Sequence, residues 1–409
     1  MNPKPDHPSL LQSLRALPRA AWILFAGTFL NKFGTFVLPF LTLYLTGRGF
    51  SLAAVGLAIG AYGAGNLCAS ILGGFLADRI GRRKTIAFSM FSSAASMLAL
   101  SQARALPALL ALTWLTGLTS EFYRPASSAL LADLIPAGQR VTAFSAYRWA
   151  FNAGWAFGPA TAGFLAARGY FWLFCGDAFT SALFGVVALA ALPRGIRSAR
   201  QESGWGEALR ELRHDRKFQQ VICAMLGIGF VFFQMATTLG LAITRAGFSA
   251  SAYGLILSLN GILIVLCELP LVTLTRRFPP RRVMALGYIL VGVGFALNGL
   301  AHTAAQFRLC MIVFTLGEMI AMPVSFAYVA DLCPPNMRGR YMGAFGLTWG
   351  LAMTLGPAAG LRLYAADPLY LWLSGALAGV TAALIILGRP PAILGSQSLA
   401  HANACEKLD

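Results

Sequence analysis

The chain is poor in charge. Only 11% of its 409 residues are Asp, Glu, Lys or Arg, whereas soluble globular domains carry about a quarter. Acidic residues are scarcest, with 15 Asp and Glu, and there are only four histidines. A soluble chain of this length would form two or three domains. The surfaces of such domains would need more charged residues than this chain has. The composition argues against a water-soluble protein.

Motifs for catalysis and metal binding are also missing. The histidines, His7, His214, His302 and His401, lie at the periphery or at the end of an apolar segment, and there is no HExxH, nucleophile or Walker A motif. The seven cysteines are scattered, which argues against a disulfide framework or a metal site. We therefore expect no cofactor and disfavour a membrane enzyme, such as a lipid transferase, and an ATP-driven pump. A sensor that keeps a carrier fold without transporting is a further alternative.

Apolar residues dominate instead, at 57% of the chain. They form twelve segments of about 20 residues, enough to cross roughly 30 Å of hydrocarbon. Backbone exposed to lipid must satisfy its own hydrogen bonds, so these segments are predicted to be helices. Their centres lie near residues 32, 64, 92, 119, 153, 181, 231, 263, 291, 318, 352 and 378. The predicted fold class is an all-α membrane protein with twelve transmembrane helices. Residues 1–19 do not read as a cleavable signal peptide, and the first span is expected to insert by itself.

The second half of the chain repeats the first at an offset of 198 residues, from Gly49 to Gly247. In the first half the matched residues are Gly49-Phe50-Ser51, Gly56, Pro125, Ala132-Asp133-Leu134, Pro136, Arg140 and Gly158-Pro159. Their counterparts in the second half, in the same order, are Gly247-Phe248-Ser249, Gly254, Pro323, Ala330-Asp331-Leu332, Pro334, Arg338 and Gly356-Pro357. A duplicated helical bundle has a cleft between its halves that can open to either side of a membrane in turn. This predicts a transporter of small molecules, for which a monomer suffices.

The expected organisation is a segment 1–19, a six-helix bundle 20–192, a linker 193–218, a second six-helix bundle 219–388 and a tail 389–409. The net charge of +17 follows this topology. Of the 32 Lys and Arg, 23 fall on the side of the termini, about six on the other side, and Lys32, Arg124 and Arg148 inside spans. By the positive-inside bias both termini and the linker are cytoplasmic. The basic excess thus indicates a multi-pass protein of a bilayer, expected to be a bacterial inner membrane, and not a nucleic-acid binder. Residues 206–217 fit either a surface amphipathic helix or a solvated tether.

The loop between the second and third spans reads Gly74-Phe-Leu-Ala-Asp78-Arg79-Ile-Gly81-Arg82-Arg83-Lys84. It resembles the loop signature of the major facilitator superfamily, G-x-L-x-D-R-x-G-R-[RK], at every defined position. The resemblance implies two pseudo-symmetric six-helix bundles and alternating access around a central cavity. It also implies that Asp78 and its basic neighbours, joined by Asp133, latch the bundles on the cytoplasmic side. The second-half copy, 275–282, keeps cations but lacks the Asp, so the latch is expected to be one-sided.

The fifth span resembles a second motif of that superfamily, which is associated with antiporters. Its positions are Gly154, Gly158, Pro159 and Gly163, with Ala162 in place of a glycine. The resemblance favours exchange and export. A kinked helix that packs closely against its neighbours is the alternative interpretation.

Charged groups inside the spans mark a cavity or a pathway, because each costs a few kcal/mol or more in hydrocarbon. The amino half offers three cations against one acid, and the carboxy half offers two acids without an evident partner. The candidate residues are Asn31, Lys32, Glu121, Arg124, Arg148 and Asn152 in the first half, and Glu268 and Glu318 in the second. Glu121 and Arg124 are i,i+3 neighbours and can pair.

Two transport hypotheses follow from this asymmetry. A buried carboxyl without a partner can exchange a proton near neutral pH, because desolvation disfavours its charged form; Glu318 is the first candidate and Glu268 the second. With an apolar, aromatic cavity this predicts proton-coupled efflux of lipophilic or cationic drug-like molecules. The alternative is a proton-coupled carrier of an anionic metabolite held by Arg124, Arg148 and Lys32. Many drug-exporting relatives carry an Arg about twelve residues before the proline at 125; here that position is Thr113, and Arg124 is the candidate substitute.

Overall fold

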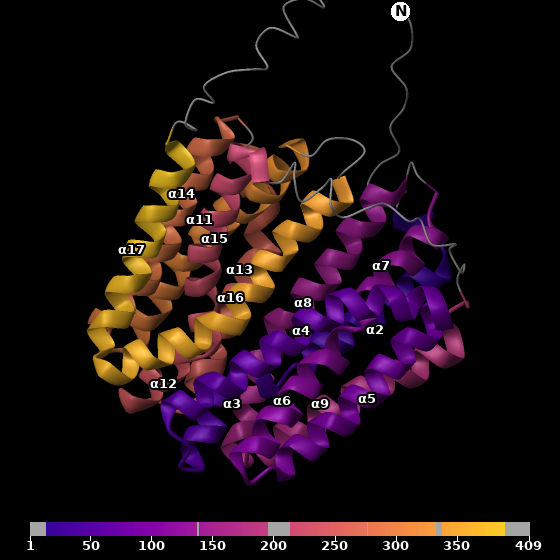
Figure 1. Ribbon diagram of the computed structural model, residues 1–409, viewed down its shortest axis with the longest axis horizontal. Coiled ribbons are helices and arrows are strands. Elements are labelled where there is room, and N and C mark those ends of the chain that lie inside the picture. The colour runs from indigo at the N-terminus through magenta and orange to yellow at the C-terminus, as the bar shows by residue number, and fades with distance from the viewer. Residues whose placement is uncertain (1–13, 137–138, 195–212, 276, 333–337, 389–409) are drawn as a thin grey trace, which may run out of the picture.

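The computed structural model describes residues 14–136, 139–194, 213–275, 277–332 and 338–388 (Figure 1). Within these ranges all regular structure is helical. The amino half contains α2 (Arg19–Phe33), α3 (Val37–Gly47), α4 (Leu52–Ile80), α5 (Arg82–Gln102), α6 (Leu106–Glu121), α7 (Tyr123–Leu134), α8 (Arg140–Arg168) and α9 (Phe171–Ala191). The carboxy half contains α11 (Arg216–Ala236), α12 (Thr238–Arg245), α13 (Ala250–Thr275), α14 (Pro280–Ala296), the short 3-10 helix η2 (Leu297–Leu300), α15 (Ala304–Leu332), α16 (Arg338–Ala366) and α17 (Pro368–Leu387).

These helices form an all-α membrane fold. In the described part of the chain, nine stretches are long and apolar enough to span a bilayer. The segments α5, α6 with α7, and α8 complete the twelve that the sequence predicts. Helix α5 is less apolar because it turns serines into the bundle: Ser89 and Ser96 are buried and bond to the Thr119 carbonyl and hydroxyl at 2.6 and 3.1 Å.

Three spans that the sequence predicts as continuous are each broken into two helices. Gly34–Phe36 separates α2 from α3, Phe122 separates α6 from α7, and Thr237 separates α11 from α12. Pro39 and Pro125 lie in the first turn of α3 and α7. Proline has no N–H to bond to the carbonyl four residues earlier, so each proline favours a break just before it.

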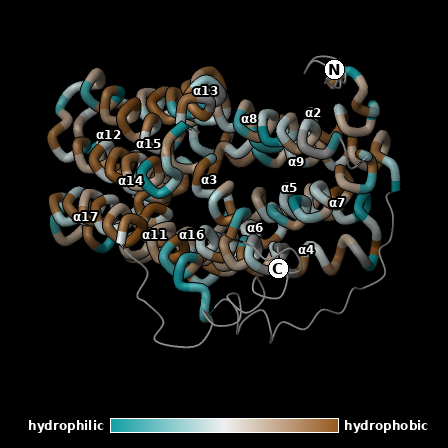
Figure 2. The backbone as a smooth tube through the Cα atoms, turned by 90° about the horizontal axis from the view of Figure 1, so that it is seen from above, coloured by the Kyte–Doolittle hydropathy of each residue, from teal (hydrophilic) through white to brown (hydrophobic). Residues whose placement is uncertain are grey.

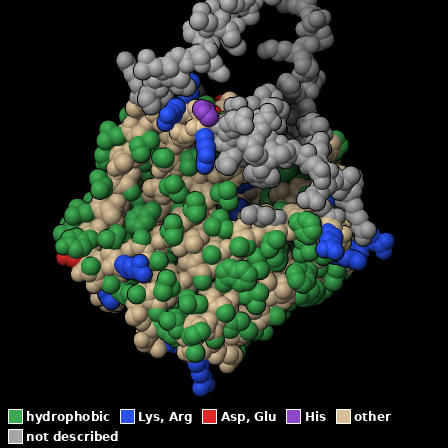
Figure 3. Space-filling view, viewed as in Figure 1, with side chains coloured by type: hydrophobic (Ala, Val, Ile, Leu, Met, Phe, Trp, Pro, Cys, Tyr) green, Lys and Arg blue, Asp and Glu red, His purple; other side chains and the backbone are tan. Residues whose placement is uncertain are grey.

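Figure 1 shows the helices in two groups, α2–α9 on one side and α11–α17 on the other, and Figure 2 shows the same division from above. The groups meet along two helix pairs, α4 with α16 and α8 with α13. In Figure 2 the carboxy-half helices α12, α14 and α17 are mostly hydrophobic, whereas α5, α7 and α8 carry more polar positions. In the space-filling view, apolar side chains spread over the visible face and Lys and Arg lie mainly towards its edges (Figure 3).

The sequence repeat has a structural counterpart at the start of α4 and α13. Gly49 and Gly247 both have positive φ, 85° and 88°, a backbone region that favours glycine. Ser51 and Ser249 each accept a hydrogen bond from a backbone N–H three residues later, at 3.3 and 3.2 Å. The repeated residues therefore build the same turn and the same helix cap in each half.

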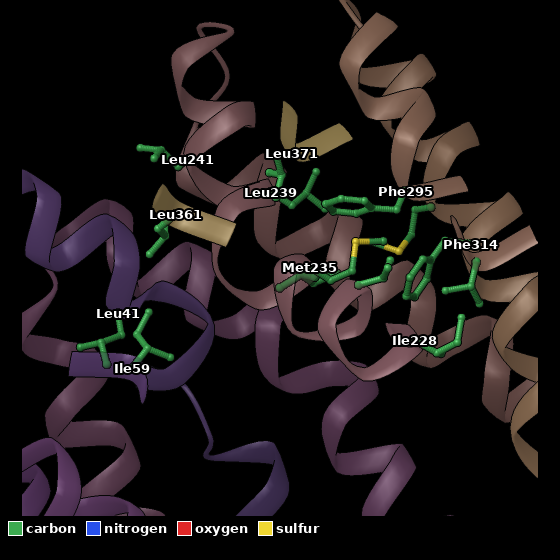
Figure 4. Packing of buried hydrophobic residues seen from close by; sticks show 14 of the residues in the cluster. Leu41, Ile59, Ile228, Met235, Leu239, Leu241, Phe295, Phe314, Leu361 and Leu371 are labelled. Carbon is green, nitrogen blue, oxygen red and sulfur yellow. The ribbon is translucent and has the colours of Figure 1, made fainter. Parts of the chain in front are cut away.

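We call the end of the molecule where α2 begins and α17 ends the terminal face, and the other end the opposite face. Towards the opposite face the two halves are in close contact. A Cβ on Gly56 of α4 would lie 2.8 Å from the Ala358 Cα of α16, and one on Gly254 of α13 would clash with the Pro159 carbonyl of α8. One buried apolar cluster continues from Leu41 and Ile59 of the amino half into the carboxy half (Figure 4). The halves are thus joined firmly at this end.

Candidate functional site

A cavity of about 590 Å³ lies between the two halves, within the usual volume range of small-molecule sites. Its wall combines aromatic side chains with polar and charged ones from both halves. The wall includes Asn31, Lys32, Tyr62, Ser120, Glu121, Arg124, Phe151, Asn152, Trp155, Asp177, Phe232, Phe233, Asn260, Glu318, Phe326 and Trp349.

The spacing of α4 from α16 shows towards which face the cavity widens. Helix α16 runs from the terminal to the opposite face, and a Cβ on its Gly343 or Gly346 would meet no atom within 4 Å. Nearer the opposite face, Cβ atoms on Gly60 and Gly63 of α4 would come within 2.6 and 2.7 Å of the α16 backbone. We call the contact between the two halves, along α4 with α16 and α8 with α13, the seam. Along α4 and α16 the seam is open towards the terminal face and closed towards the opposite face.

In the amino half, one acid binds two cations. Lys32 Nζ lies 3.1 Å from Glu121 Oε1, and both side chains are 9% exposed. Arg124 Nη1 lies 3.5 Å from Glu121 Oε2. The ring of Phe151 has Lys32 Nζ at 4.9 Å and the Arg124 guanidinium at 5.6 Å from its centre, a geometry that favours cations. The i,i+3 pairing expected from the sequence is present, and Lys32 joins it from α2.

In the carboxy half, Glu318 is held by a neutral group. Asn260 Nδ2 donates to Glu318 Oε2 at 2.7 Å and to Thr315 Oγ1 at 3.1 Å. Among the described residues Glu318 makes no ion pair. At the repeat offset, Asn260 and Glu318 correspond to Tyr62 and Ser120, whose hydroxyls are 3.1 Å apart. The two halves thus place equivalent polar pairs on the cavity wall, and only the carboxy pair includes an acid.

Glu268 differs from expectation. The sequence suggests no partner for it, but Arg148 Nη2 of α8 lies 2.7 Å from Glu268 Oε1 of α13, a pair that joins the two halves. The Arg148 side chain is 51% exposed and that of Glu268 16%. Spacing within one helix reveals partners on that helix only, so the sequence could not show this contact. Arg148 accordingly stands apart from Lys32 and Arg124.

Asn31 and Asn152, the two predicted amides, line the same cavity. Asn31 is buried, and its Nδ2 lies 3.4 Å from the Met90 sulfur. The remaining capacity of these amides can serve a bound molecule.

The loop motif lies at the terminal face between α4 and α5. Gly81 has φ of 95°, and the buried Arg82 donates to the Ala77 carbonyl at 2.9 Å and lies 3.5 Å from Asp133. Of the other motif residues, Gly74 has open space around it, Arg79 lies over the Phe75 ring, and Arg83 donates to the Leu192 carbonyl at 3.5 Å. The side chain of Asp78 lies outside the described part. The Arg82–Asp133 contact is within the amino half, so the latch between bundles stays a prediction.

The helix motif of α8 makes two contacts on different sides. Cβ atoms on Gly154 and Gly158 would lie 2.6 and 2.7 Å from carbonyl oxygens of α2, and one on Gly163 2.9 Å from the Ser251 Cα of α13. At Pro159 the helix ladder is interrupted, and the following N–H, of Ala160, donates to Ser258 Oγ of α13 at 2.8 Å. The small residues therefore hold α8 against α2 and against the other half at once.

Asp177 of α9 was not among the sequence candidates. It is 6% exposed and lines the cavity. An acid in the middle of an apolar run was a visible signal, since such residues mark function by default.

Comparison with known proteins decides the family. The sequence profile of the Major Facilitator Superfamily matches residues 24–252 and 240–403. The chain belongs to the Major Facilitator Superfamily. Within it, an uncharacterized MFS-type transporter, YttB, of Bacillus subtilis (strain 168) is 32% identical over 346 residues, covering 80% of this chain and 84% of the relative. A second, YqjV, of the same strain is 28% identical over 383 residues, covering 90% and 92%.

Other similar proteins carry names that refer to different kinds of cargo. The multidrug resistance protein MdtH of Aeromonas hydrophila is 26% identical over 384 residues, covering 91% of this chain and 96% of the relative. Among solved structures, the nucleoside transporter NupG shares the fold with a TM-score of 0.79 at 16% identity, covering 90% of this chain and 99% of the other. The protein is therefore a multi-pass transporter and not an enzyme, and its cargo must be argued from its own cavity.

Proposed function

We propose that this superfamily member exports lipophilic or cationic small molecules in exchange for protons, by alternating access. The observation that carries the proposal is Glu318, a carboxyl on the cavity wall that is bound by the neutral Asn260 and by no cation among the described residues. A carboxyl of this kind can hold a proton or a cationic group, but each excludes the other. Such competition for one group is what exchange requires.

The rest of the wall suits the same class of molecule. Phe151, Trp155, Phe232, Phe326 and Trp349 provide apolar and aromatic surface, which can bury lipophilic molecules and can attract cations through their ring faces. Among the described residues, the charged side chains on the wall are three acids, Glu121, Asp177 and Glu318, and two cations. A cationic substrate therefore meets a wall with an excess of acid.

The anionic alternative is less well supported by the same geometry. Lys32 and Arg124 bind Glu121, and Arg148 binds Glu268 about 2.7 Å away in the other half. An anion would have to share each of these cations with a carboxylate that already offsets its charge. These cations therefore do not form one open site as the alternative requires.

The proposed direction of transport depends on which side of the membrane the cavity faces. With the terminal face in the cytoplasm, as the distribution of Lys and Arg predicts, the cavity described here opens to the cytoplasm and can load cargo there. Rocking of one half against the other would then open the seam of α4 with α16 and of α8 with α13 towards the opposite face.

The test uses proteoliposomes that enclose a pH-sensitive dye and carry an imposed pH gradient. Lipophilic cations, neutral drugs and organic anions are added in turn to wild type, Glu318→Gln and Glu268→Gln. We expect cations to trigger proton movement in wild type and Glu268→Gln, and Glu318→Gln to lose it. Loss in Glu268→Gln alone would move the coupling acid to that residue. A response to anions only, abolished in Arg148→Ala and intact in Glu318→Gln, would establish the alternative.

A further inference from the structure

A small apolar pocket adjoins the main cavity, and the exchange proposed at Glu318 gives it no role. Its volume is about 70 Å³. Helices α3, α4 and α8 of the amino half and α11, α13, α15 and α16 of the carboxy half contribute to its wall. The described residues of this wall are apolar or aromatic, with Thr237 and Asn260 as exceptions. We call this space the side pocket; its wall includes Phe232, Phe233, Met235, Met311, Phe314 and Met353.

The side pocket meets the main cavity beside the acid of the carboxy half. Asn260 and Phe232 line both spaces, and Asn260 Nδ2 donates to Glu318 Oε2 at 2.7 Å. The hydroxyl of Thr237, the other polar group, donates to the Phe233 carbonyl at 2.9 Å. A molecule whose charged group lies at Glu318 therefore has an apolar space next to that group.

This space lies deeper in the molecule than Glu318. Helix α16 begins at the terminal face, so α15, which precedes it, ends there. On α15, Phe314 and Met311 precede Glu318 by four and seven residues, which places them about 6 and 10 Å closer to the opposite face. These spacings also put all three side chains on one face of the helix. A chain that extends from Glu318 towards the closed seam therefore enters the side pocket.

The wall of the side pocket suits a slim alkyl group. The ring of Phe232 has its centre 5.9 Å from that of Phe233 and 6.2 Å from that of Phe314. Met311 and Met353 add thioether chains, which adapt to the shape of a neighbour. At the roughly 30 Å³ that a water-sized group occupies in a liquid, the volume admits about two or three carbons. A benzene ring is held by apolar cavities of about 150 Å³, so an aromatic group is too large.

We infer that the side pocket is a specificity subsite, which takes the end of a short alkyl chain carried by the transported cation. The inference rests on the proposed function and narrows its substrate class to cations with one slim alkyl arm. Each methylene group that enters an apolar site should tighten binding about fourfold. Once the side pocket is full, a longer arm has no further apolar space ahead of it, because the seam beyond is closed. The gain should then end.

The test measures binding of alkyltrimethylammonium ions, from methyl to decyl, to the full chain in lipid nanodiscs. Isothermal titration calorimetry provides the affinities after subtraction of binding to empty nanodiscs, and the quaternary nitrogen keeps its charge at every pH. In wild type we expect affinity to rise about fourfold per methylene over about two or three carbons, and then to change by less than about twofold. The chain length at which the rise ends is the limiting length.

Two variants of the side pocket should move the limiting length in opposite directions. Ala236→Leu enlarges a wall side chain and should shorten the limiting length by about two or three carbons. Met311→Ala opens space in the same wall and should lengthen it by about as much. The matched control is Ala53→Leu, the same substitution at an exposed position of α4, and it should keep the wild-type limiting length.

Three outcomes would overturn the inference. They are a wild-type series without a limiting length, an equal limiting length in wild type and Ala236→Leu, and a limiting length that Gly346→Val changes and Ala236→Leu does not. The third would place the alkyl arm in the main cavity, whose wall contains Gly346. If Met311→Ala does not fold, Ala236→Leu and the smaller change Ala236→Val decide the question.

Failure of the proposed function has a separate readout. Glu318→Gln should weaken binding of the whole cation series and keep its limiting length. Neutral N-alkylacetamides with the same alkyl arms are measured in parallel. If the acetamides show a limiting length that Ala236→Leu shortens while no cation binds, the subsite stands and cation exchange at Glu318 fails. If neither series gains affinity with chain length, the subsite itself is excluded.

Discussion

Glu121 connects two cations that would otherwise be buried or half-buried without a partner. Removing one member of a buried ion pair costs about 3 kcal/mol or more, because the remaining charge is left uncompensated. We therefore expect Glu121→Gln to lower the free energy of unfolding by about 3 kcal/mol. The double variant Lys32→Met/Glu121→Leu removes the closest pair together and should lose less than the single variant. Chemical denaturation in mixed micelles measures both, and additive losses would contradict the pairing.

The pair of Arg148 and Glu268 is expected to affect the distance between the two halves and not the stability of the fold. A pair with one side chain half exposed contributes only about 0–1 kcal/mol, so its loss should leave the fold intact. It does join α8 to α13, and like charges there should push the helices apart. We expect Glu268→Arg to lengthen the distance between labels at Ser145→Cys and Leu274→Cys, on the terminal side of this seam. The charge swap Arg148→Glu/Glu268→Arg should restore the wild-type distance; if it does not, the pair does not control the seam.

At the scale of elements, the seam depends on glycines that face backbone. A Cβ on Gly254 would clash with the Pro159 carbonyl, whereas one on Gly346 meets open space. Gly254→Ala should therefore lower the free energy of unfolding by about 1–3 kcal/mol through overpacking. Gly346→Ala, within helix α16, should be neutral or stabilising by about 0.5–1 kcal/mol. Thermal unfolding of the two variants side by side provides the comparison, and equal effects would show that the seam tolerates added volume.

The elements also show what the sequence could and could not predict. Apolar runs and the repeat were enough for the fold class, and a lone acid inside an apolar run was enough to expect Glu318 on the cavity wall. At the break before α12, Gln234 at the end of α11 binds the Gly356 carbonyl of α16, 122 residues away. At the break before α3, Thr180 of α9 packs on Gly34. The local signs of the break before α3 are Gly34 and the proline in the first turn of α3. The Arg148–Glu268 pair joins residues 120 positions apart, and no spacing rule reaches that far.

At the scale of the whole molecule, residues of the sequence repeat also form the seam, which is the joint between the halves. Gly56 packs beside Pro357 and Ala358, and its counterpart Gly254 packs on Pro159. In each half, the equivalent glycine thus packs against the equivalent proline-containing segment of the other half. Equivalent contacts on both sides of a pseudo-symmetric joint allow one half to rock without unfolding either. The charged groups break this symmetry: in the described cavity wall, cations come from the amino half only, and an acid held by a neutral amide from the carboxy half.

The open side of the joint predicts a pattern of chemical accessibility. Gly346 lies on the cavity wall where the seam is open to the terminal face, and Gly47 lies exposed at the opposite face. In a cysteine-free background, Gly346→Cys should react with a membrane-impermeant maleimide in inside-out vesicles, and Gly47→Cys in right-side-out vesicles. The reason is that the positive-inside bias places the terminal face in the cytoplasm. The reverse pattern would show that the cavity opens to the exterior, and export would have to begin from the other conformation. Reaction of Gly346→Cys from both sides would instead show that the halves exchange between the two openings without cargo, as rocking about a pseudo-symmetric joint permits.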